Sequence, residues 1–215
     1  EIVNGLGRGH QPALIALWRD AIAATRPALA IDVGANYGEF LLNVRYPSGT
    51  AAVGVEANPR LVPLLRRSIA AHPDAHRITL HAVLASDIDD GEERLRVDPG
   101  WSGTAATSLD RSVDGRALVE VTVPVRTLDG LIPPPWPSAT GGLVLKMDVE
   151  GYELSALRGA RRSIAAHRPR LCVSAYHRPT DLVSLSEFVL SIRDDYRVGV
   201  RHHTPLRWDT CLYFY

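Results

Sequence analysis

Net charge and long apolar runs are both missing from this sequence of 215 residues. Twenty-four Lys and Arg residues balance 24 Asp and Glu residues, so the formal net charge is 0 at pH 7. Proteins that bind nucleic acid by neutralising phosphates are usually basic, and we therefore expect no nucleic-acid partner. No run of about 18 apolar residues occurs, so we expect no membrane span.

Cysteine and lysine are scarce as well. Two cysteines, Cys172 and Cys211, are too few for a disulfide framework, and both lie in apolar, strand-like runs. We interpret them as buried, reduced thiols. Because no signal peptide is visible either, we expect a cytoplasmic protein. Lys146 is the single lysine among 24 basic residues, which suggests a position where arginine would not serve.

The remaining composition is that of a globular protein. Hydrophobic residues make up 46% of the chain and charged residues 22%. The length favours one domain with insertions. We predict a single domain over 1–215, with an N-terminal helical segment at 1–27 and an insertion or lid at 88–142.

Apolar runs alternate with helical patterns along most of the chain. Strands are predicted at 28–33, 51–56, 78–84, 143–149, 170–176, 196–202 and 209–215. Helices are predicted at 11–25, after Pro59, at 151–167 and at 181–192. This alternation favours an α/β fold with a doubly wound, mostly parallel sheet.

The end of the chain and the insertion break this alternation. The last two predicted strands are joined only by residues 203–208, which is too short for a parallel crossover, so they must form an antiparallel hairpin. Within the insertion, 92–97 and 119–125 read as two paired strands. We therefore predict a seven-stranded sheet that ends in an antiparallel hairpin, with a β insertion between its third and fourth strands.

A glycine turn follows the first predicted strand. It consists of Gly34, Ala35, Asn36, Tyr37 and Gly38. Glycines allow a tight turn and a close approach to a ligand, and a strand-to-helix turn points backbone N–H groups at that ligand. Glu56 ends the next strand, where a carboxylate can accept hydrogen bonds from both hydroxyls of a ribose.

The turn and Glu56 would suit either NAD or S-adenosylmethionine. The turn lacks the full G-x-G-x-x-G pattern for a pyrophosphate. Asp32, just before the turn, suits a cationic amino group better than a phosphate. The antiparallel ending also favours the methyl donor. A nicotinamide-dependent oxidoreductase, which needs the last two strands to be parallel, and a non-catalytic binding module remain as alternatives.

Four segments resemble the FkbM family of S-adenosylmethionine-dependent methyltransferases. They are IDVGANYG, VGVEANP, LKMDVEGYELSALRGA and WDTCLYFY, and the resemblance runs from about residue 28 to residue 215. It implies the class I methyltransferase (Rossmann-like) fold, with strand order 3-2-1-4-5-7-6. It also implies O-methylation of a sugar or a natural product in biosynthesis. N-methylation on the same fold is a further alternative, and the oligomeric state stays open.

The same resemblance implies where the donor binds. The turn from Gly34 to Gly38 would hold the methionine part, and Asp148 would sit by the methionyl amine and the methyl group. The ribose would bind at Glu56. The residues expected to bind the cofactor are Asp32, Gly34, Ala35, Asn36, Tyr37, Gly38, Glu56, Asn58, Ala85, Ser86 and Asp148, with Ala85 and Ser86 flanking the adenine.

Candidate catalytic residues lie where the predicted strands end, because ligands of open α/β sheets bind there. An alcohol must lose a proton during methyl transfer, and histidine is the natural base. We take His177 as the first candidate and His202 as the second. Four other histidines, His72, His76, His81 and His167, are interpreted as structural.

Lys146 and Asp148 are two residues apart on one strand and therefore share a face. Three interpretations of Lys146 compete. It can form a buried ion pair with Asp148 or Asp32, contact the substrate or stabilise a developing alkoxide, or act as a desolvated general base. Glu150 and Glu153 also have a structural interpretation, since acids in the first turn of a helix interact favourably with its dipole.

Two further expectations concern the surroundings of the site. Asp148, Glu150, His177 and His202 carry oxygen and nitrogen ligands that could converge on a divalent metal, although no tight ligand spacing supports one. Trp101, Ser102 and Trp136 in the insertion could line the pocket of a small-molecule acceptor.

Overall fold

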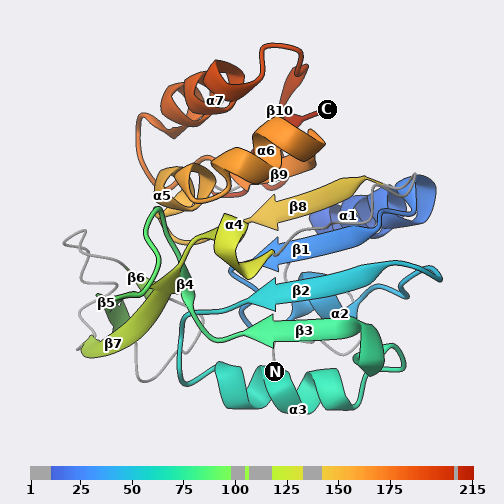
Figure 1. The fold of residues 1–215 in the computed structure, drawn as a ribbon, viewed down its shortest axis with the longest axis vertical. Coiled ribbons are helices and arrows are strands. Elements are labelled where there is room, and N and C mark those ends of the chain that lie inside the picture. Colours follow the sequence, from blue (N-terminus) through green and yellow to red (C-terminus); the bar gives the residue numbers. More distant parts are fainter. Residues whose placement is uncertain (1–10, 98–104, 107–117, 133–141, 206–207) are drawn as a thin grey trace.

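A seven-stranded sheet forms the centre of the fold, which Figure 1 shows as a computed structural model. The structure describes residues 11–97, 105–106, 118–132, 142–205 and 208–215. The strands of this main sheet are β1 (Leu29–Val33), β2 (Ala51–Val55), β3 (Ile78–His81), β8 (Leu143–Met147), β9 (Arg170–Ser174), β10 (Val198–His202) and β11 (Thr210–Phe214).

The order of strands in the main sheet is β10-β11-β9-β8-β1-β2-β3. Counted along the chain within this sheet, that order is 3-2-1-4-5-7-6, as expected. Neighbouring strands are parallel from β3 to β9, whereas β11 is antiparallel to both β9 and β10. The short connection between the last two strands therefore predicted their hairpin correctly.

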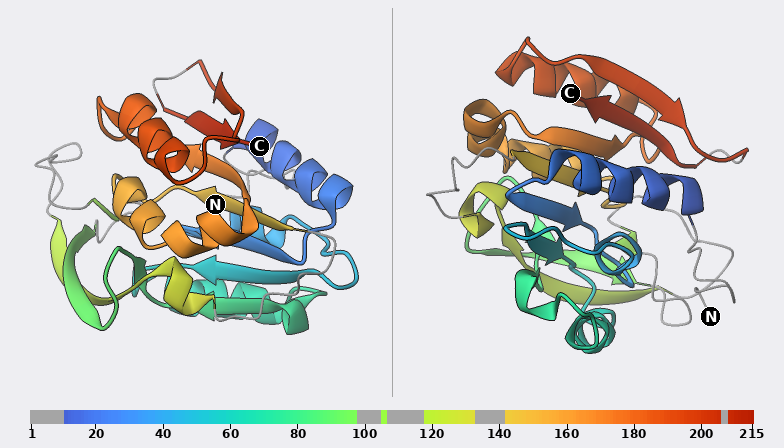
Figure 2. Two further views of the ribbon diagram at one scale, coloured as in Figure 1. Left: turned by 45° about the horizontal axis from the view of Figure 1, so that its top comes forward. Right: turned by 90° about the vertical axis from the view of Figure 1, so that its right-hand side faces the viewer.

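Helices cover both faces of the main sheet (Figure 2). One layer consists of α1 (Pro12–Thr25), α2 (Glu39–Leu42) and α3 (Val62–Ala70). The other layer consists of α4 (Leu128–Leu131), α5 (Glu153–Arg158), α6 (Arg161–His167) and α7 (Asp181–Ile192). A 3-10 turn, η1 (Ala75–Arg77), precedes β3. Because β1 and β8 lie between the two layers, every residue in them is buried, which explains their continuous apolar pattern.

A second, smaller sheet lies between β3 and β8 in the chain. Its strands, in the order β4-β7-β5-β6, are β4 (Leu84–Ala85), β7 (Val119–Arg126), β5 (Gly91–Val97) and β6 (Ala105–Ala106). β5 and β7 pair in antiparallel fashion, which confirms the paired strands predicted within the insertion. The role of residues 88–142 as a lid stays a prediction.

Two predicted elements are each divided in the structure. The strand predicted at 78–84 ends at His81, because the chain then leaves the main sheet and Leu84 pairs with Val125 of β7. The helix predicted at 151–167 breaks between α5 and α6 at Gly159. A Cβ at Gly159 would lie 1.9 Å from the carbonyl oxygen of Ser86, so glycine allows these two segments to pack together.

Within the described ranges, no helix combines the length and the apolar character that crossing a bilayer would need.

Candidate active site

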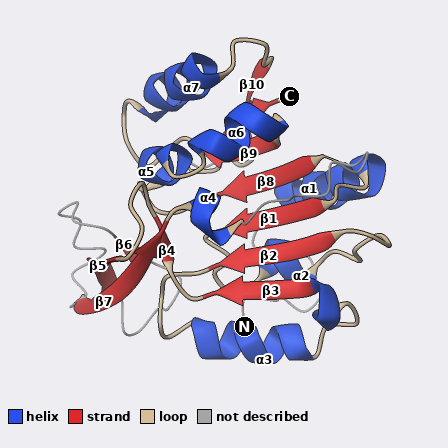
Figure 3. Cartoon of the chain, in the orientation of Figure 1, coloured by secondary structure: helices blue, strands red, loops and turns tan. Residues whose placement is uncertain are grey.

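The carboxyl ends of the central strands meet at one edge of the main sheet. In Figure 3, the arrowheads of β8, β1, β2 and β3 end at the same side, and the smaller sheet stands beside them. Ligands of open α/β sheets bind in the crevice outside this edge. The candidate residues that follow these strands are therefore brought together by the parallel pairing.

Gly34 joins the ends of β1 and β8. It has φ of +78°, and a Cβ there would lie 1.8 Å from the carbonyl oxygen of Asp148. The backbone N–H of Asp148 donates to the carbonyl of Val33 at 3.0 Å. A side chain at Gly34 would push the two strand ends apart, so this glycine serves the packing that sets the position of Asp148.

The backbone amides of the glycine turn bond within the protein. Gly34 and Ala35 both donate to the carbonyl of Val55, at 2.9 and 3.0 Å, and Gly38 donates to Ala35 at 2.7 Å. The helix that follows, α2, has only 4 residues. The expectation that these N–H groups point at a ligand is therefore wrong for these three amides, because the turn uses them to hold its own shape.

Glu56 connects the turn with the end of β2. Its Oε2 accepts from the backbone N–H of Asn36 at 2.7 Å, and its Oε1 accepts from that of Asn58 at 2.7 Å. Burial raises the pKa of Glu56, while these two hydrogen bonds oppose the rise. Each carboxylate oxygen has a further lone pair, so the geometry leaves acceptor capacity for ribose hydroxyls.

Asp32 and Lys146 form an ion pair beneath the turn. They lie opposite each other on β1 and β8, and their Nζ–Oδ1 distance is 3.2 Å. The side chain of Asp32 is 0% exposed. Neither of its oxygens has a hydrogen-bond partner among the described residues apart from this pairing. A buried carboxylate with spare acceptor sites suits a cationic ligand group.

The ion pair supports the first of the three interpretations of Lys146 and disfavours the third. Burial opposes the charge of Lys146, but the carboxylates of Asp32 and Asp148 outweigh burial and raise its pKa above the ordinary value. A lysine that keeps its proton cannot act as a general base, so that interpretation does not fit. The structure forms the pair with Asp32 rather than Asp148.

We expect Lys146→Met to destabilise the protein by about 3–5 kcal/mol, because it leaves the buried Asp32 carboxylate without its counter-charge. Urea unfolding at neutral pH measures this loss. The matched control is the double variant Asp32→Asn with Lys146→Met, which should recover most of the stability. A single variant that loses less than about 1 kcal/mol would contradict a stabilising pair.

Asp148 lies in a group of titratable side chains after β8 and β9. The hydroxyl of Tyr176 donates to its Oδ1 at 3.1 Å, and Nε2 of His177 lies 3.6 Å from the same oxygen. Nε2 is also 3.3 Å from Oε2 of Glu150, and Nδ1 is 2.9 Å from Oε1 of Glu153. Three carboxylates therefore surround one imidazole.

The groups around His177 shift the pKa of its imidazole. Burial lowers the pKa of His177, but its contacts with Glu150, Glu153 and Asp148 outweigh burial and raise the pKa to about 11. Its side chain is 9% exposed, and both ring nitrogens are covered. A substrate hydroxyl cannot reach these nitrogens in this arrangement. The predicted role of His177 as the base is therefore not supported by its position.

His202 lies apart from this group. Its Nδ1 is 2.8 Å from the hydroxyl of Thr210, and no contact between described side chains joins it to Asp148 or His177. The expected convergence of His202 on a shared metal is therefore not formed, whereas Glu153 joins the group instead. The four histidines interpreted as structural, His72, His76, His81 and His167, lie outside the group as well.

The other residues predicted to bind the methyl donor lie at two places along the chain. Asn58 is 1% exposed and follows Glu56 directly. Ala85 and Ser86 lie at the junction of the two sheets, where the N–H of Ser86 donates to the carbonyl of Arg126 at 2.9 Å. Their contact with an adenine stays a prediction. Trp101, Ser102 and Trp136 lie outside the described residues.

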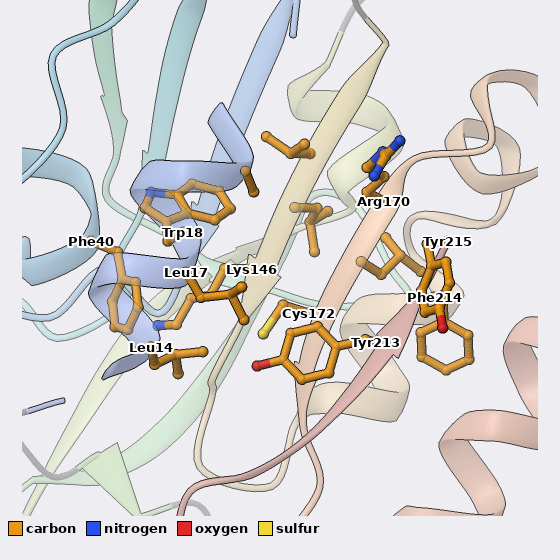
Figure 4. A pocket seen from close by; sticks show the side chains of 14 residues that line it. Leu14, Leu17, Trp18, Phe40, Lys146, Arg170, Cys172, Tyr213, Phe214 and Tyr215 are labelled. Carbon is orange, nitrogen blue, oxygen red and sulfur yellow. The ribbon is translucent and has the colours of Figure 1, made fainter. Parts of the chain in front are cut away.

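A cavity of about 160 Å³ adjoins Lys146 on the α1 side of the sheet (Figure 4). Its wall is mainly apolar and includes Leu14, Trp18 and Phe40 from the helices, with Cys172 and Tyr213 from the strands. Ligand pockets usually measure about 300–1,000 Å³, so this cavity is too small for a whole nucleoside ligand. Both cysteines of the chain are free thiols, with Cys211 buried and Cys172 half-buried.

Two members of the group were not singled out as site residues from the sequence. Tyr176 was recognised only as the end of a strand, and Glu153 only as an acid near a helix start. Glu153 does accept from the N–H of Val149 at 2.9 Å, as a residue in the first turn of α5 can. The E-G-x-E spacing from Glu150 to Glu153 was the available signal, but it does not show that His177 lies between them.

Comparison with known proteins identifies related sequences and folds. A family model described as the methyltransferase FkbM domain matches residues 32–197. A solved structure of methyltransferase FkbM from Methylobacillus flagellatus KT is 36% identical, with a TM-score of 0.65. The match covers 88% of this chain and 44% of that chain, so the present chain spans less than half the length of this relative. No curated protein matches the sequence.

More distant solved structures share the fold. Magnesium protoporphyrin IX methyltransferase from Synechocystis PCC 6803, with bound S-adenosylmethionine, is 9% identical with a TM-score of 0.53, covering 95% of this chain and 78% of that one. An O-methyltransferase from Bacillus cereus, in complex with S-adenosylhomocysteine, is 11% identical with a TM-score of 0.52, covering 94% and 80%. These likenesses confirm the class I methyltransferase fold.

Proposed function

This chain belongs to the FkbM family of S-adenosylmethionine-dependent methyltransferases, and from that membership we propose that it methylates a hydroxyl group of a small acceptor. The acceptor class that we propose is a sugar or a natural product made by a biosynthetic enzyme set. The observation that supports this most is Glu56, whose carboxylate is fixed at the end of β2 by two backbone amides and keeps acceptor capacity for a ribose.

The donor-binding part of the proposal rests on two carboxylates at the ends of neighbouring strands. Asp32, which Lys146 holds in place beneath the turn, would favour the methionyl ammonium through its negative charge. Glu56 would accept hydrogen bonds from the ribose hydroxyls, with its carboxylate fixed by the amides of Asn36 and Asn58. The fixed orientation means that little freedom is lost on binding.

When bound, S-adenosylmethionine supplies a methyl group on a positively charged sulfur that leaves readily. The contribution of the protein is then mainly alignment, and holding two reactants together can lower the barrier by about 7–11 kcal/mol. Because Gly34 has no side chain, the glycine turn can lie against the backbone of Asp148. The turn that would hold the methyl donor therefore adjoins the residue that would take the proton.

Asp148 is the proton acceptor that we propose for the acceptor hydroxyl. Its side chain is 17% exposed, compared with 9% for His177, and it lies at the end of β8 beside the turn. As the new oxygen–methyl bond forms, the hydroxyl proton passes to a carboxylate oxygen of Asp148. A positioned base contributes about 10²–10⁴-fold to the rate.

His177 and Tyr176 are positioning residues in this proposal. The Tyr176 hydroxyl donates to Asp148, and His177 lies beside the same carboxylate. Together they fix the side chain of Asp148 against the end of β9. His202 is exposed at the end of β10, and the role that we propose for it is contact with the acceptor.

Methyl transfer can be tested with a donor whose methyl group carries deuterium. The protein is incubated with this donor and a panel of sugars, glycosides and hydroxylated natural products, and the products are fragmented by mass spectrometry. The proposal expects the label on an oxygen of one of these acceptors. A label found on nitrogen instead would exclude O-methylation and identify the N-methylation alternative.

A further inference from the structure

A group of charged side chains that includes Asp148 contains more carboxylates than the proposed proton transfer requires. It consists of Asp148 after β8, Glu153 at the start of α5 and His177 after β9, and we call it the carboxylate–histidine group. We propose that the carboxylate–histidine group binds a divalent metal ion. This goes beyond the proposed function, because methyl transfer from a sulfonium needs no metal for its leaving group.

The distances within the group fit a shared ion. One oxygen or nitrogen from each of its three members lies within 4.8 Å of the other two. Nδ1 of His177 lies 2.9 Å from Oε1 of Glu153 and Nε2 lies 3.6 Å from Oδ1 of Asp148, so one ion would be bound through only one of the two ring nitrogens. Two ligands that each lie about 2.0–2.2 Å from one ion stand roughly 3–4 Å apart, so the imidazole would turn until one nitrogen faces both carboxylates.

Members of this group carry buried polar atoms without hydrogen-bond partners. The Glu153 side chain is 1% exposed, and its Oε2 has no hydrogen-bond partner. Both ring nitrogens of His177 also lack a hydrogen bond with acceptable geometry, although carboxylate oxygens lie close to them. Buried polar atoms are nearly always satisfied in folded proteins, so these atoms require a ligand. A bound cation would satisfy Oε2 of Glu153 and one of the two ring nitrogens.

The charges of the group also favour a cation. Within the described parts of the chain, neither Asp148 nor Glu153 forms an ion pair with lysine or arginine; His177 contacts both, and Lys146 acts on Asp148 only from a longer distance. Glu150 adds a third carboxylate 3.3 Å from Nε2 of His177. A single protonated imidazole does not balance the carboxylates of both Asp148 and Glu153, and burying charge without a full counter-charge is costly.

A purely structural interpretation explains only part of the group. Glu153 accepts from the backbone N–H of Val149, which closes the first turn of α5. This accounts for Oε1 but leaves Oε2 buried without a partner. Pairing of His177 with Asp148 and Glu153 explains its place between the two elements, but this pairing also leaves Oε2 of Glu153 without a partner.

The chemistry of the ligands narrows the choice of metal ion. Two carboxylates and one imidazole suit divalent ions such as Mn²⁺ or Zn²⁺, whereas sites for Ca²⁺ and Mg²⁺ are built from oxygen ligands. Glu150, whose side chain is 37% exposed, stands at the solvent side, where a further ligand or a water molecule would complete the coordination. Mn²⁺ is the probe of choice because free and bound ions have different electron paramagnetic resonance signals.

The experiment titrates Mn²⁺ into the full chain, without donor or acceptor, and follows the signal of free Mn²⁺. The wild-type protein should bind one ion per chain. His177→Gln and Asp148→Asn should each weaken binding at least about tenfold, as loss of a ligand or its close support does. Binding should also raise the melting temperature of the wild type, because the ion binds the folded state.

Matched controls carry the same chemical changes elsewhere on the surface. Glu187→Gln on α7 and His167→Gln at the end of α6 are exposed and should bind Mn²⁺ like the wild type. Glu153→Gln should weaken Mn²⁺ binding as well, because its amide oxygen can still accept from the N–H of Val149 but the negative charge is lost. A wild type that binds no stoichiometric ion, or a His177→Gln variant that binds as tightly as the wild type, overturns the proposal.

A parallel titration with S-adenosylmethionine in the presence of a chelator separates this inference from the proposed function. Donor binding without Mn²⁺ binding overturns the metal site alone. Mn²⁺ binding without donor binding supports the metal site and counts against the donor site instead.

Discussion

Asp148→Asn should lower kcat for methyl transfer by about 10²–10⁴-fold, because it removes the proposed proton acceptor while it keeps the shape of the side chain. The asparagine oxygen can still accept from the Tyr176 hydroxyl, which lies 3.1 Å from Oδ1, so the local fold should be preserved. The donor dissociation constant should change far less than kcat. Single-turnover rates with the labelled donor measure the effect.

The control for this variant is Asp20→Asn, which makes the same change at an exposed position on α1. It should transfer methyl groups at the wild-type rate. If Asp148→Asn keeps kcat within about threefold of the wild type, another group takes the proton and our assignment of Asp148 is wrong.

Glu56→Gln should weaken donor binding by about 10- to 100-fold, since hydrogen bonds to a charged group contribute roughly 1.5–3 kcal/mol. The ribose hydroxyls would lose an anionic acceptor. In addition, the new amide group would face the N–H of Asn36 or Asn58, both of which now donate to the carboxylate. Titration calorimetry with S-adenosylmethionine measures the loss of affinity.

A change in stability has to be separated from a change in binding. We expect Glu56→Gln to cost about 1–3 kcal/mol of unfolding free energy as well, because one buried N–H loses its acceptor. Thermal melting shows whether the variant is folded at the temperature of the titration. Glu187→Gln should bind the donor normally, and an unchanged affinity in a folded Glu56→Gln variant would remove Glu56 from the donor site.

The fold could be predicted from the sequence where local patterns are strong. The continuous apolar runs of β1 and β8 marked buried central strands, and the short segment before β11 required a hairpin. The exact order of the strands came from the family resemblance. The break after His81 could not be predicted, because the apolar pattern continues although the chain changes sheets. Gly159 likewise fits a helical pattern, and only its contact with Ser86 explains the break between α5 and α6.

The candidate site depended on contacts between elements that are far apart in the sequence. Spacing placed Lys146 and Asp148 on one face, but only the register between β1 and β8 pairs Lys146 with Asp32. β10 and β11 pair in antiparallel fashion, whereas the oxidoreductase alternative needs these two strands to be parallel. The position of His177 between carboxylates of other elements has no signal in the local sequence, and neither does the burial that covers its nitrogens.

The most direct measurement is a calorimetric titration of the wild-type chain with S-adenosylmethionine and, separately, with NAD. Our account predicts that one molecule of S-adenosylmethionine binds per chain and that NAD produces no binding heat. Binding of NAD alone would contradict the account, because the carboxylates of Asp32 and Glu56 would then serve a different ligand.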